Sequence, residues 1–154
     1  MDYTLTEETV LNDLRMLKKS KLDFVSLHSR VSFASFLECM GDSSILLSDQ
    51  NNQRLSLSGC IMTFCYNCYF GLLQLKNKQK VVVYAFGTEQ GDFNLELYQE
   101  GSTLIILSDK KKYRFDFDAF LKEFKGFYQK IIKDLIHFYR GIEECKHFKQ
   151  FLTI

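Results

Sequence analysis

The chain has 154 residues, a formal net charge of +1 and an apolar fraction of 46%. This length predicts a single domain, residues 1–154, with a substantial core, and the apolar fraction excludes wholesale disorder. The small net charge gives no overall bias toward nucleic acid or an anionic membrane, so neither is predicted as a partner.

The N-terminal sequence indicates a cytoplasmic protein. Its first residues, MDYTLTEETVL, lack the basic and apolar regions of a signal peptide. The most apolar segment, residues 61–75, is too short and too polar for a membrane-spanning helix. Five cysteines at irregular spacing, without a signal peptide, are typical of reduced and buried thiols.

The first predicted helix covers residues 6–19, with Thr4 or Thr6 as its cap. Its apolar residues recur at helical spacing: Val10, Leu11, Leu14 and Leu17. Residues 22–31 fit both a strand and a helix, and we favour an extended segment. A short helix over residues 32–40 is expected to stop at Gly41.

From Ser44 the apolar period changes to two, which indicates strands. Residues 55–65 alternate as one long strand, and 69–75 are a further apolar run. Residues 81–86 are a β-branched run typical of burial on both faces. The connections are too short for parallel crossovers, so we expect antiparallel hairpins. Counted with the segments 44–48, 93–98, 103–107 and 113–117, these runs predict an antiparallel sheet of about five to seven strands.

A long amphipathic helix is predicted over residues 117–139, capped by Asp116 or Asp118. Its apolar stripe consists of Phe117, Leu121, Phe124, Tyr128, Ile131, Leu135 and Phe138, with further apolar residues on both flanks. The stripe is wider than one contact with a sheet requires, so part of it is expected to meet the N-terminal helix or a second copy of the chain in a homodimer. Gly126 in mid-helix indicates close packing or a bend. A last helical piece is expected from Gly141 to about Phe151.

The order of helix, strands and long helix predicts an α+β domain. In this fold class an antiparallel sheet is flanked by the N-terminal helices and carries the long C-terminal helix.

The clearest candidate for chemistry is Cys65-Tyr-Asn-Cys68, which could be half of a zinc site or a redox pair. A four-cysteine site needs a second CxxC, and none occurs. A redox CxxC opens a helix, whereas this one lies in a strand-like run, so structural packing is favoured. The histidines are scattered, and GxSxG, HExxH and glycine-rich phosphate loops do not occur. We therefore predict no enzymatic activity, no metal and no cofactor.

Charge patterning provides the candidate partner site. Four acidic residues follow one another without an intervening Lys or Arg: Glu89, Asp92, Glu96 and Glu100. They are either a solvated strand edge kept soluble by charge or a docking patch for a basic partner, such as a nucleic-acid-cleaving toxin. The basic turn that follows, Lys110 to Arg114, is too small a footprint to indicate nucleic-acid binding by itself.

The segment YRFDFDAFLKEF, residues 113–124, followed by Phe127-Tyr128 and Asp134-Leu135, resembles the ends of several bacterial immunity-protein families. These families belong to polymorphic toxin systems, including contact-dependent growth inhibition. The resemblance covers residues 80–140 and assigns a role to no residue. It implies a cytoplasmic protein that binds and neutralises one cognate toxin without catalysis.

An alternative function is a small-ligand-binding or regulatory α+β module. Its pocket would lie between the sheet and the long helix, lined by aromatic side chains, with polar groups such as Tyr128 and His137 converging on it.

Overall fold

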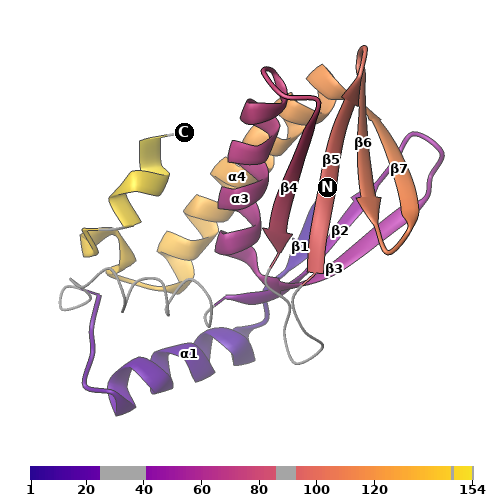
Figure 1. Cartoon of the computed structure of the whole chain (residues 1–154). Helices are drawn as coiled ribbons and strands as arrows, with labels where there is room; N and C mark the ends of the chain where they lie inside the picture. Colours follow the sequence, from indigo (N-terminus) through magenta and orange to yellow (C-terminus); the bar gives the residue numbers. More distant parts are fainter. Residues whose placement is uncertain (25–40, 86–92, 147, 154) are drawn as a thin grey trace.

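The computed structural model describes residues 1–24, 41–85, 93–146 and 148–153. They form an α+β fold with two antiparallel sheets (Figure 1). The helices are α1 (Glu7–Lys19), α3 (Ile61–Leu75) and α4 (Phe117–Phe138). The strands are β1 (Asp2–Thr4), β2 (Asp42–Ser48), β3 (Arg54–Cys60), β4 (Lys80–Ala85), β5 (Phe93–Glu100), β6 (Thr103–Ser108) and β7 (Lys111–Asp116).

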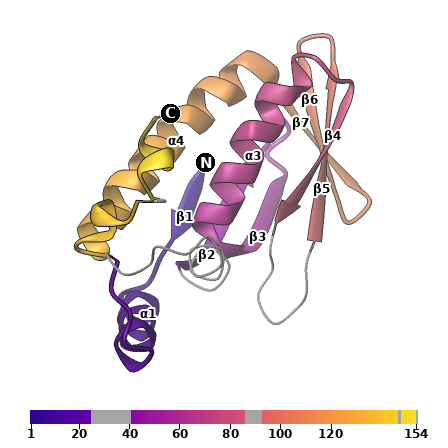
Figure 2. The ribbon, with the colours of Figure 1, turned by 60° about the vertical axis from the view of Figure 1, so that its left-hand side comes forward.

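The expectation of one sheet is wrong. One sheet has three strands in the order β1-β2-β3, and the other has four in the order β4-β5-β6-β7. The reason is α3, which follows β3 directly and takes the chain out of the first sheet before the second begins. Both α3 and α4 lie beside the four-stranded sheet, and Figure 2 shows the two helices next to each other.

Helix α3 is the largest departure from the prediction, which places strand-like runs at residues 55–65 and 69–75. Strand β3 ends at Cys60, and the next fifteen residues are one helix. This segment has no charged residue, and most of it is buried. A helix that is apolar all round has no polar face to reveal the helical period. No side chain caps its start, so the alternation of β3 runs into it without a visible boundary.

Helix α4 confirms the predicted long helix, and the carboxylate of Asp116 accepts a hydrogen bond from the amide of Ala119 at its start. Its apolar side packs on both the sheet and α3. The ring of Phe120 lies 4.7 Å from that of Phe115 in β7, and Phe124 lies 6.0 Å from Phe64 in α3. The wide stripe thus meets α3 and, through Phe127, the ring of Tyr3 in β1, although Phe138 is 40% exposed.

Helix α1 confirms the predicted first helix, and Thr6 is its cap. The buried carboxylate of Asp13 joins α1 to the end of α4, because it accepts hydrogen bonds from the amide of Gly41 at 2.9 Å and from the hydroxyl of Tyr139 at 2.5 Å. Burial raises the pKa of Asp13, and these two hydrogen bonds oppose that rise. The predicted helix over 32–40, and all but residues 22–24 of the ambiguous segment, lie outside the described residues.

The four-stranded sheet confirms the hairpin predictions for β5, β6 and β7. Asp109 and Lys110 form the turn between β6 and β7, and both have positive φ, as the tight turns of β-hairpins require.

The prediction that the 81–86 run is buried on both faces is wrong, because Val82 in β4 is 41% exposed while Val83 is 2% exposed. Within the described residues β4 pairs only with β5, so it forms an edge of this sheet.

Asp49, which the sequence marks only as a turn residue, connects the two sheets. One carboxylate oxygen accepts hydrogen bonds from the amides of Asn51 and Gln53, each at 2.8 Å. The other accepts from the amide of Arg114 in β7 at 3.2 Å, and the amide of Gln50 donates to the carbonyl of Arg114 at 3.0 Å. The turn between β2 and β3 is therefore held against β7.

The predicted last helical piece appears as two short 3-10 helices, η1 (Ile142–Glu144) and η2 (Phe148–Thr153). Phe148 and Phe151 are buried in the common core. Among the described residues, no helix combines the length and apolar character that crossing a membrane requires.

Candidate functional site

The four-stranded sheet has one face toward the core and one toward solvent. Leu97 and Val83 lie on the inner face, against Gly71 of α3. Because side chains alternate along each strand, the residues next to Val83 in β4 and next to Leu97 in β5 point to the opposite side. We call the opposite side the outer sheet face. It comprises Lys80 and Val82 of β4, Glu96, Tyr98 and Glu100 of β5, Thr103, Ile105 and Leu107 of β6, and Lys112 and Arg114 of β7.

One row across this face has the composition of a protein-binding centre. The strand register places Tyr98, Ile105 and Arg114 opposite one another on β5, β6 and β7. Ile105 is only 3% exposed, yet it does not belong to the main core cluster, so its burial is on the outer side of the sheet. Tyr and Arg are among the side chains most enriched at the residues that contribute most of the binding energy in protein interfaces.

The predicted acidic patch is described only in part, since Glu89 and Asp92 lie outside the described residues. Glu96 accepts a hydrogen bond from the hydroxyl of Tyr98 and forms an ion pair with Lys80 at 3.0 Å. These two contacts, the Tyr98 hydroxyl first, lower the pKa of Glu96. Its negative charge is therefore offset locally by Lys80.

Glu100, at the end of β5, is exposed on the same face. The face as a whole is of mixed charge, with Glu96 and Glu100 on β5 and with Lys112 and Arg114 on β7. The described part of the acidic patch, Glu96 and Glu100, is thus one side of a larger surface. That surface could not be found from the sequence, because the apolar run of β6 does not show which of its residues face outward.

Cys65 and Cys68 lie in the body of α3, in its second turn rather than at its start. Both thiols are free and buried. Burial raises the pKa of Cys68 to about 12 and that of Cys65 well above its ordinary value, so both are protonated at neutral pH. Protonated thiols are poor nucleophiles and poor metal ligands, which favours the packing role. Their placement in a strand-like run is wrong, because the strand pattern ends at Cys60.

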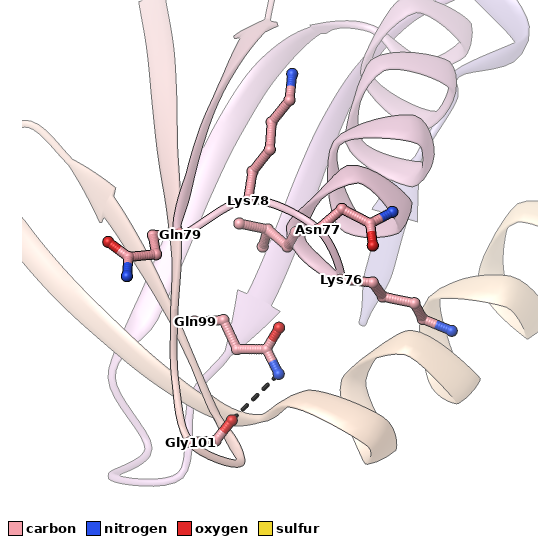
Figure 3. Close-up of a pocket in the computed structure, with 7 residues that line it drawn as sticks. Lys76, Asn77, Lys78, Gln79, Gln99 and Gly101 are labelled. Atoms are coloured by element: carbon pink, nitrogen blue, oxygen red, sulfur yellow. Dashed lines mark hydrogen bonds between the residues drawn. The ribbon is translucent and has the colours of Figure 1, made fainter.

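No group of three His, Cys, Asp or Glu side chains suited to a metal ion occurs within the ranges that the structure describes. A hollow of about 380 Å³ at the end of α3 is lined by Lys76, Asn77, Lys78, Gln79, Gln99 and Gly101, together with Leu75. In Figure 3, Lys76, Lys78 and Gln79 point in different directions, and the Gln99 amide is held by the carbonyl of Gly101 at 3.1 Å. These side chains do not converge on a common point.

A second cavity, of about 330 Å³, lies between α4 and η2. Its lining consists of Tyr128, Gln129, Ile132 and Lys133 of α4 and Phe151 and Leu152 of η2. The ligand pocket expected from the sequence lies between the sheet and the long helix, whereas the cavity that Tyr128 lines is between the long helix and η2. His137, the expected partner of Tyr128, does not line the cavity; it is exposed near the end of α4.

The chain was compared with known protein families, with curated proteins and with solved structures, and none of the three comparisons found a match.

Proposed function

We propose that this protein is a bacterial immunity protein of the polymorphic-toxin kind, as in contact-dependent growth inhibition. It binds and neutralises one cognate toxin in the cytoplasm and performs no catalysis. The toxin is a basic protein, such as a nuclease. The immunity protein acts by covering the toxin's active site or the path of its substrate.

The observation that supports this proposal is the outer sheet face. It presents Tyr98 and Arg114 on either side of the buried Ile105, with charged residues around them. Central aromatic and arginine side chains supply most of the binding energy in protein interfaces, whereas charged residues at the rim guide association and reject wrong partners. The resemblance of residues 80–140 to immunity proteins includes this whole face.

The direct test is co-expression with the product of the neighbouring toxin gene. We expect the two proteins to purify together and the cells to survive toxin expression. Absence of both the complex and the protection would refute the proposal.

A matched pair of variants tests the surface. Arg114→Ala removes an exposed arginine from β7 in the outer sheet face, and Arg54→Ala removes an exposed arginine from β3 in the other sheet. We expect the first to weaken toxin binding by about 2 kcal/mol, or roughly thirtyfold, and the second to leave it unchanged. Equal affinities of the two variants would place the interface elsewhere.

The two described residues of the acidic patch are expected to affect association differently. Glu96 is paired with Lys80 on this face, whereas Glu100 forms no ion pair with any residue that the structure describes. Glu100→Lys should therefore slow association more than Glu96→Gln does, and the difference should shrink as salt screens the charge. The triple variant Glu89→Lys, Asp92→Lys, Glu96→Lys tests the other three residues of the predicted patch together. Unchanged affinity of that variant across a salt series would remove the patch from the interface.

A further inference from the structure

One residue that lines the cavity between α4 and η2, Tyr128, carries a polar group that core packing alone does not explain. Tyr128 is 2% exposed. Among the described residues, its hydroxyl is the only buried side-chain oxygen or nitrogen without a hydrogen-bond partner. A buried polar group that lacks a partner lowers stability, so its presence in a native protein calls for an explanation, and a bound ligand supplies one. Phenylalanine would fill the same space in the core without that loss.

The cavity that Tyr128 lines is apolar on one side and has a basic residue on the other. The ring of Tyr128 lies 5.9 Å from that of Tyr69 in α3, and Phe151 lies 5.2 Å from Tyr66 of the same helix. Ile132 and Leu152 complete the apolar wall. The cavity also has an exposed lysine, Lys133, beside the exposed amide side chain of Gln129.

We propose that this cavity binds a small amphipathic acid. The ligand has a short apolar body against Ile132 and Phe151, a hydroxyl or carbonyl oxygen that pairs with the Tyr128 hydroxyl, and a carboxylate that pairs with Lys133. The volume of about 330 Å³ is at the small end of the range for ligand pockets, roughly 300–1,000 Å³. Because the Tyr128 oxygen is buried, a side chain of the cavity wall must shift to admit the ligand.

This site is separate from the proposed toxin-binding surface. The cavity is built from α4 and η2, whereas the outer sheet face is on the side of β4–β7 that points away from α3. Its test needs neither a toxin nor an assay of neutralisation, so it can fail while the proposed function stands.

Three probes test the proposed contacts with Tyr128 and Lys133 separately: ω-hydroxyoctanoate, octanoate and octanediol. Binding to the native state raises the melting temperature. We expect ω-hydroxyoctanoate to raise it most. Octanoate should bind about tenfold more weakly because it cannot pair with Tyr128, and octanediol should bind more weakly because it lacks the carboxylate.

The variants separate a binding role from a packing role. Tyr128→Phe should melt at a higher temperature than the wild type without ligand, yet it should no longer distinguish ω-hydroxyoctanoate from octanoate. Lys133→Gln should no longer distinguish the acid from the diol. Lys125→Gln, which changes an exposed lysine of α4 outside the cavity, is the matched control and should behave as the wild type.

Two results would overturn the proposal. One is that none of the probes raises the melting temperature at millimolar concentration. The other is that Tyr128→Phe retains the preference for ω-hydroxyoctanoate, since this would show that the hydroxyl makes no contact with the ligand.

Discussion

Gly71 lies at the closest contact between α3 and the four-stranded sheet. A methyl group added at this position would stand 2.6 Å from Cγ2 of Val83 and 3.3 Å from Cδ1 of Leu97. The first distance is far below the roughly 3.5–4.0 Å at which carbon atoms attract one another. Val83 is β-branched and therefore cannot easily rotate away. We predict that Gly71→Ala destabilises the protein by forcing α3 away from β4 and β5.

Gly126 of α4 provides the matched control, because a methyl group added there has no neighbour within 4 Å. Both substitutions bring the same gain in helix propensity, up to about 1 kcal/mol. Only Gly71→Ala also overpacks the core, which typically costs about 1–3 kcal/mol. Gly126→Ala should therefore raise the free energy of unfolding by up to about 1 kcal/mol. The free energy of unfolding of Gly71→Ala should be about 1–3 kcal/mol lower than that of Gly126→Ala.

Urea unfolding followed by circular dichroism measures both differences, provided that the slopes with denaturant agree. The double variant Gly71→Ala, Val83→Ala should lose less stability than the sum of its two single changes, because the smaller side chain removes the clash. The reasoning would be refuted if Gly71→Ala stabilised the protein as much as Gly126→Ala does. In that case α3 would not be held at this distance from the sheet.

Three further predictions concern polar groups. Asp49→Ala leaves three backbone amides without their carboxylate acceptor and should cost about 2–4 kcal/mol in urea unfolding, whereas Asp49→Asn, which keeps one oxygen, should cost less. Asp116→Ala removes the cap of α4 and should cost about 1 kcal/mol, while Asp116→Asn should cost little. Asp13 has a raised pKa in the folded protein, so the folded state binds a proton on this carboxylate more tightly than the unfolded state does. The wild type should therefore gain stability relative to Asp13→Asn as the pH falls through that raised pKa toward the ordinary value near 3.8, and thermal unfolding across this pH range measures the gain.

Much of the fold could be predicted because local rules determine it. The stripe of α4 and its cap at Asp116 are encoded within one segment, as is the cap of α1 at Thr6. The β5–β6 and β6–β7 hairpins follow from alternation and from short turns. In α1, α4 and β5 one face meets the core and the other meets water, so the side-chain pattern records the secondary structure, whereas the apolar run of β6 is delimited by the turns on both sides of it.

The candidate surface was predicted less well. Glu96 and Glu100 could be identified from charge alone, but the pairing of Glu96 with Lys80 depends on the β4–β5 register. The row of Tyr98, Ile105 and Arg114 also depends on register. Side chains from three strands form it, and no local pattern in the chain relates those strands.

The sequence by itself determined the α+β class, the long helix and the meander of β4 to β7, because α4 and β5 have one polar and one apolar side and short polar turns separate the strands. Only the tertiary structure decided that residues 61–75 form a helix and that the strands divide into two sheets. A segment buried on nearly all sides has no polar face, so its period is invisible until its neighbours are known. The contacts that place it, Gly71 against Val83 and Asp49 against β7, join residues far apart in the chain.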